Sequence, residues 1–231
     1  MEKEDPKGVV ERVLSRRNIP LVGYAAVEDL PEGIDDEDTE WGWKFSRQDL
    51  LDQVKRVLPD ARTVILFGMP FPPEADVRIR IADGDNDRII VPYVSYLSEA
   101  AQRLVTELER AGYPSERFPR GWGFKHYGRA ANLGVRGHHG MLINPDYGPR
   151  MRFHAMVTSA EIEERLPEPE VECRQCGACV RACPSGALSD QGFCRTRCRT
   201  FGDTTEIIHT WCSLCADACY QAVKDKSQAS V

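Results

Sequence analysis

The sequence lacks an uninterrupted apolar run of the length that crosses a bilayer, so no membrane span is expected. It also lacks the GxxxxGK(S/T), HExxH, GxSxG and protein-kinase motifs, and nothing supports phosphoryl transfer or hydrolysis by those routes. Positive charge is not in excess, because 30 Lys and Arg against 36 Asp and Glu give a formal net charge of -6. That balance argues against nucleic acid as the main partner, and no nucleic-acid binding is expected.

The N-terminal residues MEKEDPKGVV are acidic and polar, unlike a secretory signal or a twin-arginine leader. A cytoplasmic protein is therefore expected, in a compartment where thiols stay reduced. Cysteine is absent before Cys173 and after Cys219, so all nine cysteines fall in one short stretch. The odd count and the length of 231 residues argue against a disulfide framework.

The cysteine stretch begins with Cys173-x2-Cys176-x2-Cys179-x3-Cys183-Pro184, the bacterial ferredoxin pattern for cubane iron–sulfur clusters. In this pattern three closely spaced thiolates hold one cluster, and the fourth cysteine ligates a second cluster. The downstream residues Cys194, Cys198, Cys212, Cys215 and Cys219 supply the remaining ligands, with one left over. A zinc site is the alternative, although zinc uses four ligands in two separated pairs and the x2-x2 run exceeds that need.

The part before the cysteines alternates between predicted helices and strands. Ser46 is a predicted N-cap with Asp49 three residues later, and it opens a helix that continues through Leu58. Helices are also expected at 7–17, 93–111 and 130–133, and strands at 21–27, 63–69, 77–82, 141–143 and 151–157. The order predicts an α/β or α+β domain at 1–165, followed by a cluster domain at 166–223 and a disordered tail at 224–231.

The segment AANLGVRGHHGMLINPDYGPRMRFHAMVTSAEI, together with the downstream double-cluster array, resembles the epoxyqueuosine reductase and reductive dehalogenase superfamily. The local sequence around Arg136-Gly137-His138 and Tyr147-Gly148-Pro149-Arg150 is more similar to the dehalogenase branch. The resemblance implies a nitroreductase-like sheet-and-helix domain, a small bacterial-ferredoxin-like domain with two 4Fe-4S clusters, and base-off cobalamin beside the first cluster.

The resemblance also implies a ligand set for each cluster. The crossed ferredoxin pattern assigns Cys173, Cys176, Cys179 and Cys219 to the first cluster. Cys183, Cys212, Cys215 and either Cys194 or Cys198 then hold the second cluster. Cys198 is preferred, because its separation from Cys183 is closer to the spacing in the superfamily, and Cys194 is left spare.

Site residues outside the cysteine array are expected in the glycine-rich stretch. A phenol or imidazole beside a cation can donate a proton in a reduction, which makes Tyr127, Arg136 and His138 the catalytic candidates. The resemblance implies contacts with the corrinoid from the glycine-rich segment and the turn after it: Gly134, Gly137, His139, Asn144, Tyr147, Gly148 and Arg150. Epoxyqueuosine reductases carry an Asp-Tyr-His before the long helix, where this chain has Val91-Pro92-Tyr93-Val94.

The sequence thus predicts an iron–sulfur reductase that passes electrons through two clusters to a corrinoid, for reduction of a small-molecule substrate. A low-potential donor such as ferredoxin or flavodoxin is the expected electron source. The alternative is a non-catalytic two-cluster electron carrier or activator that serves the cofactor of a partner protein.

Overall fold

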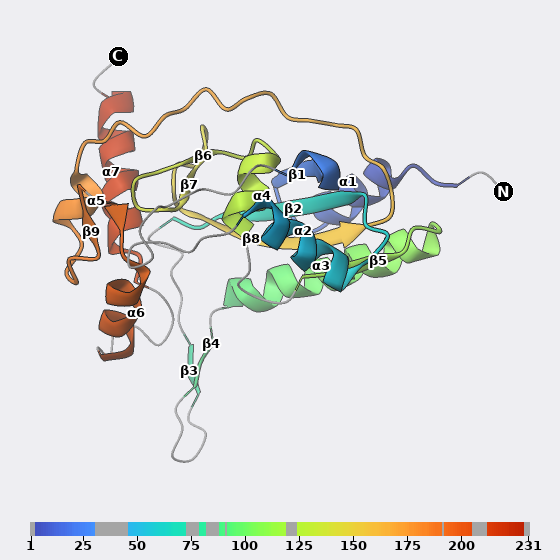
Figure 1. Ribbon diagram of the computed structural model, residues 1–231, viewed down its shortest axis with the longest axis horizontal. Helices are drawn as coiled ribbons and strands as arrows, with labels where there is room; N and C mark the ends of the chain where they lie inside the picture. The colour runs from blue at the N-terminus through green and yellow to red at the C-terminus, as the bar shows by residue number, and fades with distance from the viewer. Residues whose placement is uncertain are drawn as a thin grey trace.

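The computed structural model describes residues 3–30, 46–72, 79–81, 88–90, 92–118, 124–190, 192–204 and 212–228. Figure 1 shows a sheet with its helices on one side of the molecule and the cysteine-bearing helices α5, α6 and α7 at the opposite end. The fold class predicted from the sequence, a mixed helix-and-sheet part followed by a ferredoxin-like segment, is confirmed.

The main sheet has four strands in the order β1-β2-β8-β5, and every neighbouring pair is antiparallel. Its strands are β1 (Leu21–Ala26), β2 (Thr63–Pro70), β8 (Met151–Thr158) and β5 (Ser115–Arg117). Residues Thr63 to Gly68 of β2 are all buried, because β2 lies between two other strands and both faces of the sheet are covered. This explains the near-continuous apolar sequence of the strand.

Alternate side chains of β2 serve two hydrophobic clusters, as the period of a strand requires. Ile65 and Phe67 belong to the cluster formed with α1 (Pro6–Ser15) and α3 (Pro92–Arg110). Val64 and Leu66 belong to the cluster formed with α2 (Arg47–Val57) and α4 (Phe124–Ala130). The sheet is therefore the middle layer between two pairs of helices.

The capping box predicted at Ser46 is present. The Ser46 hydroxyl accepts a hydrogen bond from the Asp49 backbone N–H, and the Asp49 carboxylate accepts one from the Ser46 N–H. Both donors would otherwise be unsatisfied at the start of α2.

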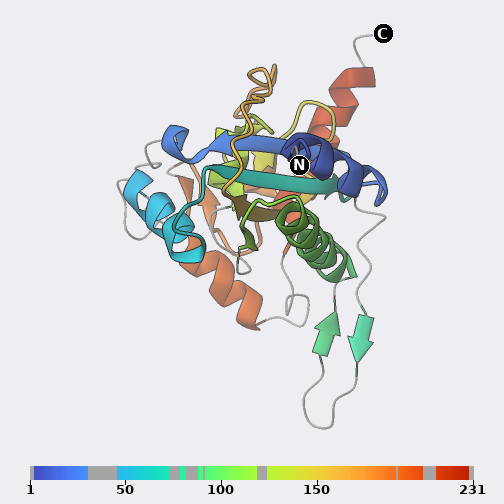
Figure 2. The ribbon, with the colours of Figure 1, turned by 90° about the vertical axis from the view of Figure 1, so that its right-hand side faces the viewer.

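Short elements complete the fold. They are the 3-10 turn η1 (Val27–Asp29), the pair β6 (Val135–Arg136) and β7 (Leu142–Ile143), and the pair β3 (Ile79–Ile81) and β4 (Arg88–Ile90). Strands β3 and β4 project away from the rest of the molecule in Figures 1 and 2. The cysteine-bearing end contains α5 (Ala178–Arg181), β9 (Leu188–Ser189), β10 (Gly192–Phe193), α6 (Arg195–Thr204) and α7 (Leu214–Gln228).

An extended segment joins the sheet to the cysteine-bearing end. Residues 161–169 have no helix or strand, and in Figure 1 the chain runs from the end of β8 across the molecule to α5. The domain boundaries predicted from the sequence place their division in this segment, and they stay a prediction.

Two sequence expectations differ from the structure. The short helix expected at 130–133 is wrong: helix α4 lies at Phe124–Ala130, and residues 131–132 form a turn. The helix was missed in the sequence because it contains Gly128, and glycine is unfavourable within a helix. Glycine is required at this position because a Cβ atom would lie 2.4 Å from Leu142 Cδ1. The tail expected to be disordered from Lys224 is helical to Gln228, and the Lys224 ammonium lies 4.5 Å from the centre of the Tyr220 ring, one turn earlier on the helix.

Among the described residues, no helix has the combination of length and apolar character that spanning a membrane requires.

Candidate metal centre

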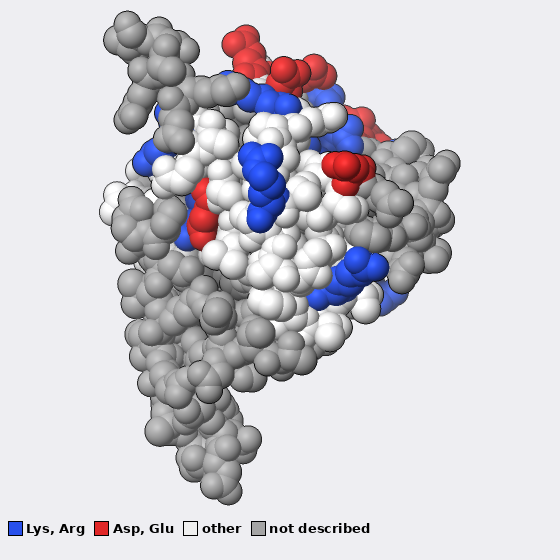
Figure 3. Space-filling model, turned by 90° about the vertical axis from the view of Figure 1, so that its left-hand side faces the viewer, with Lys and Arg blue, Asp and Glu red and all other residues white. Residues whose placement is uncertain are grey.

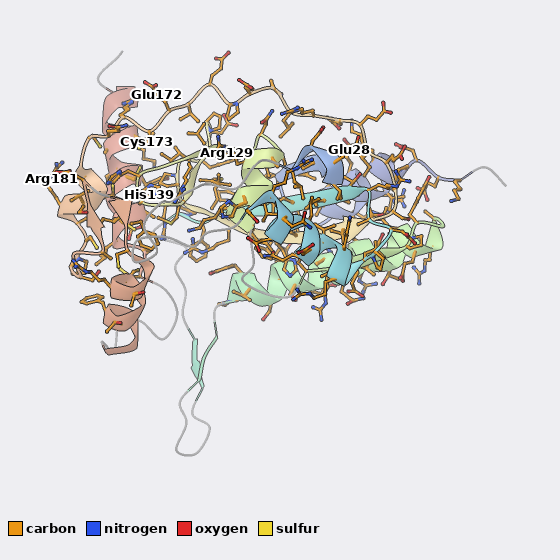
Figure 4. The ribbon with its side chains drawn as sticks, in the orientation of Figure 1. Glu28, Arg129, His139, Glu172, Cys173 and Arg181 are labelled. Carbon is orange, nitrogen blue, oxygen red and sulfur yellow. The ribbon has the colours of Figure 1, made fainter. Side chains whose placement is uncertain are left out.

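Four cysteines from two distant parts of the sequence line one cavity. The cavity measures about 800 Å³, and its walls include Cys173, Cys176, Cys179 and Cys219, which we call the first thiol set. Packing of α5 against α7 brings Cys219 to the other three. Figure 3 looks onto this end of the molecule, and Figure 4 shows Glu172, Cys173 and His139 near α7 with Arg181 at the outer edge.

The loop that carries the first thiol set bends through two left-handed residues. Gln175 has φ 48°, and Gly177 has φ 70° as the N-cap residue of α5. Left-handed backbone is easy for glycine and uncommon for glutamine, so this loop is held in a shape that its sequence does not favour. The bend turns the x2-x2 spacing into a wrap of three thiols around one volume.

Mutual repulsion shows which thiols lie close together. Burial, together with repulsion from Cys179, Cys176 and Cys173, raises the pKa of Cys219 to about 11. Burial likewise raises the pKa of Cys215 to about 12, with added repulsion from Cys212, Cys198 and Cys183. We call Cys183, Cys198, Cys212 and Cys215 the second thiol set. Thiols crowded in this way deprotonate when a metal binds, because the metal offsets the repulsion.

The two sets are interleaved along the chain. Cys179 and Cys183 are four residues apart but belong to different sets, and so do Cys215 and Cys219 on α7. Cys194 belongs to neither set; it is only 1% exposed, and its N–H donates to the Ala187 carbonyl at 2.7 Å. The structure thus groups the thiols as the sequence assignment did, and the ligation itself stays a prediction.

Hydrogen bonds to sulfur support both sets. The His138 N–H donates to Cys173 Sγ at 3.3 Å, and Ser185 Oγ lies 3.3 Å from Cys183 Sγ. Although burial alone would raise the pKa of Cys183, the hydrogen bonds from Ser185 and nearby backbone groups lower it. Hydrogen bonds to thiolate sulfur are one of the means by which a protein sets the potential of an iron–sulfur cluster.

No three His, Cys, Asp or Glu side chains in the described ranges converge as ligands of a single metal ion would. A cubane cluster has no such requirement, because each thiolate binds a different iron atom. The donors present, two sets of four thiols with hydrogen bonds to sulfur, fit iron–sulfur clusters.

Residues 134–140 of the glycine-rich stretch contribute His138 and His139 to the cavity, and Ile143 on β7 also lines it. Close packing within the chain explains two glycines of the stretch. A Cβ atom on Gly134 would lie 2.5 Å from the Ile143 carbonyl oxygen, and one on Gly137 would lie 2.5 Å from His139 Cε1. Both glycines therefore allow the chain to pack against itself, and a contact with a corrinoid is not needed to explain them. Arg136 is half-buried on β6 and is not among the cavity-lining residues.

His139 is a buried, neutral imidazole in the cavity wall. It is 3% exposed, and its Nδ1 accepts a hydrogen bond from the Met141 N–H at 3.1 Å. The ring proton is therefore on Nε2, which has no hydrogen-bond partner among the described residues. A buried donor of this kind is costly unless a ligand accepts from it.

We expect His139 to make the stability of the protein depend on pH. Burial, followed by repulsion from Lys125 and His138, lowers the pKa of His139 from 6.5 to about 4. His139 therefore becomes protonated below pH 6.5 in the unfolded chain but only below about pH 4 in the folded chain. The free energy of unfolding has its full value above this pH window and falls as the pH decreases through it. Between about pH 7.5 and about pH 5 the loss is about 2 kcal/mol.

The matched variant is His139→Asn, whose side-chain oxygen can still accept from the Met141 N–H but does not titrate in this range. Denaturant unfolding at both pH values, under anaerobic conditions, gives the two free energies for each protein. The variant should lose about 2 kcal/mol less than the parent. Equal losses in both proteins would show that His139 is not the titrating group.

The turn after the glycine-rich stretch is organised by Asn144. Its Oδ1 accepts from the N–H groups of Asp146 and Tyr147 at 3.0 and 3.1 Å, and its Nδ2 donates to the Leu133 carbonyl at 2.8 Å. Gly148 closes the turn with φ 62°, a conformation for which glycine is suited. None of Asn144, Tyr147 or Gly148 lines the cavity, so their predicted corrinoid contacts stay untested predictions.

Arg150 connects the sheet to the cysteine-bearing end. Its side chain is 1% exposed, and its guanidinium lies 3.2 Å from the Asp217 carboxylate on α7 and 5.4 Å from the centre of the Phe71 ring. Asp217 stands midway between Cys215 and Cys219. Sequence reasoning missed Asp217, although its place between two cysteines was a signal that could have drawn attention to it.

Tyr127 lies in the core and not in the cavity. Its ring stacks on Phe118 with 5.1 Å between ring centres, and its hydroxyl donates to the Leu50 carbonyl at 3.3 Å. Burial raises the pKa of this phenol well above its usual value. Of the three catalytic candidates, the structure brings only His138 to the cavity.

Comparison with known proteins follows this geometry. Residues 170–189, which contain the first four cysteines, match the protein family described as a 4Fe-4S binding domain. The chain is 22% identical over 204 residues to an epoxyqueuosine reductase of Lactococcus garvieae, covering 80% of this chain and 57% of that protein. It is 30% identical over 101 residues to a tetrachloroethene reductive dehalogenase of Desulfitobacterium hafniense, covering 42% of this chain and 18% of that one.

Solved structures agree in fold. The epoxyqueuosine reductase of Streptococcus thermophilus superposes with a TM-score of 0.63 at 18% identity, covering 92% of this chain and 65% of that chain. The resemblance to this superfamily, predicted from the sequence, is confirmed. An epoxyqueuosine reductase solved with a tRNA stem loop has a TM-score of 0.63 at 17% identity, over 93% and 65% of the two chains. A reductive dehalogenase, whose description refers to B12-dependent dehalogenation, gives 0.52 at 13% identity, over 88% and 30%.

The longer sequence alignment is the one to an epoxyqueuosine reductase, so the leaning towards the dehalogenase branch gains no support. The chain spans less than two thirds of these relatives: 57% of the Lactococcus protein and 65% of the Streptococcus chain. The fold and the iron–sulfur segment are thus shared with the superfamily.

Proposed function

We propose that the chain is an iron–sulfur reductase that passes electrons through two 4Fe-4S clusters to a corrinoid in the cavity, for reduction of a substrate. The observation that carries the proposal is the composition of the cavity wall. The first thiol set forms one part of it, and His138 and His139 from the glycine-rich stretch form another. A cluster on these thiols would thus lie in the cavity, next to the proposed cofactor.

The remaining wall is mixed in character. Its apolar part includes Ile143, Val171, Val180, Ala222 and Val223, and its polar part includes Glu170, Glu172, Arg174, Gln175 and Asp190. Apolar walls with a few polar groups are typical of cofactor sites. A bound corrinoid supplies low-valent cobalt as the reductant, and the clusters supply its electrons. The likeness to a reductive dehalogenase described in terms of B12 supports this cofactor.

His138 is the proposed proton source. Its Nε2 lies 2.6 Å from the Ser189 carbonyl oxygen, so Nε2–H donates to that carbonyl and the ring is held in place. In the imidazolium form the proton at Nδ1 is then the one left to transfer. Tyr127 is buried in the core, and Arg136 does not line the cavity, so His138 is the candidate that the geometry supports.

Epoxyqueuosine reduction in tRNA is the second candidate function. The alignment over 204 residues and the structural neighbour with a tRNA stem loop favour it. The expectation that nucleic acid is no partner is corrected accordingly, because a net charge of -6 averages the whole surface and does not exclude a local RNA-binding face. Val91-Pro92-Tyr93-Val94 in place of Asp-Tyr-His means that another residue would have to donate the proton.

Anaerobic reconstitution tests the proposal. We expect about eight iron and about eight sulfide per chain, because each thiol set holds one cubane. Cob(II)alamin added to this protein should change to its base-off form, measured by electron paramagnetic resonance. Ala222→Trp fills the cavity from α7 and should abolish the change while the iron content stays the same. The matched control is Gln221→Trp, on the exposed side of the same helix.

Several outcomes would reject parts of the proposal. Zinc without acid-labile sulfide would replace both clusters by a structural metal. Full clusters with cobalamin left in its free form would favour the non-catalytic electron carrier. If Ala222→Trp and Gln221→Trp behaved alike, the corrinoid would bind elsewhere.

A further inference from the structure

A buried ion pair links the sheet to the helix that carries thiols of both sets. Its facing atoms are Arg150 Nη1 and Asp217 Oδ1, which lie 3.2 Å apart, and both atoms are shielded from solvent. The Arg150 carbonyl accepts a hydrogen bond from the N–H of Phe71, directly after β2, at 2.7 Å. The other carboxylate oxygen of Asp217 accepts one from the Ser213 hydroxyl at 3.1 Å. The two charges therefore meet out of contact with water, and each residue is anchored on its own element.

Asp217 has the same relation to both thiol sets. On α7 it follows Cys215 of the second set by two residues and precedes Cys219 of the first set by two residues. Because a helix has about 3.6 residues per turn, the two thiols point to nearly the same side of α7 and Asp217 points to the opposite side. The backbone of α7 therefore lies between the ion pair and the thiols, over a distance of roughly 10 Å, the width of a helix.

A charge at this distance changes the reduction potential of a cluster. Reduction adds one electron and no proton, so a positive neighbour favours the reduced cluster and a negative neighbour opposes it. At roughly 10 Å and an effective dielectric constant of about 20, one unit charge changes the one-electron equilibrium constant about tenfold. Net charge around an iron–sulfur cluster is one of the features that set its potential. The balance between Arg150 and Asp217 is therefore felt on the far side of α7.

We propose that the Arg150–Asp217 pair sets the reduction potentials of both clusters together. Arg150 offsets the negative charge that Asp217 places between the two thiol sets, and it thereby keeps both clusters reducible at a less negative potential. Because Asp217 is equally spaced from one ligand of each set, the two potentials move in parallel and the difference between them is retained. The proposal rests on the proposed function, since it needs a cluster on each thiol set.

Redox titration of the cluster-loaded protein, followed by low-temperature electron paramagnetic resonance, tests the pair. Arg150→Met should lower both potentials, because the Asp217 carboxylate loses its ion-pair partner. Asp217→Asn should raise both potentials, because the positive charge of Arg150 is then no longer offset by this carboxylate. Each shift should correspond to about a tenfold change in the equilibrium constant with a one-electron mediator. The double variant, which has neither charge, should return close to the parent.

The opposite signs of the two shifts separate an electrostatic role from a structural one. Both single changes are expected to loosen α7, and a looser cluster site would move the potentials of both variants in the same direction. Arg150→Lys keeps the positive charge and should leave both potentials close to those of the parent. Arg150→Gln removes the charge but keeps a polar side chain. It should lower both potentials as Arg150→Met does, so the test stands even if the methionine variant loses its clusters.

Two control variants make the test specific. Lys7→Met also removes the partner of a carboxylate, since Lys7 Nζ lies 2.6 Å from Glu164, but this pair is exposed. It should shift neither potential, because α1 lies at the other end of the molecule from α7 (Figure 1). Ser185→Ala removes a hydroxyl that lies 3.3 Å from Cys183 Sγ. It should lower the potential of the second cluster alone, because only that cluster loses a hydrogen bond to sulfur.

Shifts of the same sign in Arg150→Met and Asp217→Asn would overturn the inference, and so would unchanged potentials in both variants. A shift confined to one cluster would overturn the common action of the pair. Failure of the proposed function gives a different result. If iron and sulfide analysis showed fewer than two clusters, the inference would fall together with its premise before any potential was measured. If both clusters were present and cobalamin did not bind, only the corrinoid part of the proposed function would fail.

Discussion

Cys198→Ser is expected to remove one cluster from the reconstituted protein, whereas Cys194→Ser keeps both. The reason is proximity: Cys198 adds to the repulsion felt by the Cys215 thiol together with Cys212 and Cys183. Cys194 is 1% exposed and is outside both thiol sets. Serine is a poor ligand in place of a thiolate, so Cys198→Ser should lower the iron content from about eight to about four per chain.

Iron and sulfide analysis with low-temperature electron paramagnetic resonance distinguishes the two variants. Cys194→Ser is the matched control, because both changes replace a cysteine within the same four-residue interval. Conversion of the second cluster to a three-iron form in Cys198→Ser would also agree with the assignment. If Cys194→Ser lost the cluster and Cys198→Ser kept it, the second thiol set would have to be redrawn.

Arg150→Met is expected to weaken the attachment of α7 to the sheet. The Arg150 side chain is 1% exposed and its guanidinium is 3.2 Å from the Asp217 carboxylate, which is 32% exposed. Arg150→Met removes the ion-pair partner of the Asp217 carboxylate and leaves it with the Ser213 hydroxyl, which donates to it at 3.1 Å; the expected cost is about 3 kcal/mol. For a chain of this size the thermal midpoint should fall by about 6–12 °C.

The pair also predicts an order among the variants. Asp217→Asn should cost more than Arg150→Met, because Arg150 is the more deeply buried of the two charges and loses its ion pair with Asp217. The double variant should cost less than the sum of the two single changes, as expected for residues in contact. Release of iron to a chelator should be faster in both single variants, since Asp217 lies between Cys215 and Cys219. Additive losses in the double variant would show that the two residues do not interact.

Local sequence rules predicted the parts of the fold that depend on near neighbours. The start of α2 was predictable, because Ser46 and Asp49 satisfy each other within one turn. The iron–sulfur chemistry was predictable for a similar reason: cubane ligation requires three thiols on a short loop, and this requirement is written in the spacing from Cys173 to Cys179.

Contacts between distant residues decided what could not be predicted. Tyr127 and His138 looked alike as candidates, but Tyr127 faces Leu50 in the core, 77 positions away, and His138 faces the cavity. The partner of Arg150 is on α7, which no local pattern indicates. The glycine-rich stretch suggested a bare surface for a cofactor, whereas Gly134 and Gly137 make room for Ile143 and His139.

For clusters bound on the two thiol sets as proposed, the interleaving of the sets would also fix how far an electron has to tunnel. Cys179 with Cys183, and Cys215 with Cys219, each pass from one set to the other within four residues, and the second pair lies on one continuous helix. Four residues advance a helix by roughly 6 Å. The distance between two clusters on these ligands would therefore be set by the backbone at two positions, between Cys179 and Cys183 and between Cys215 and Cys219. Domain motion cannot lengthen it without breaking a turn of helix, so the rate of exchange between clusters bound in this way would be insensitive to such motion.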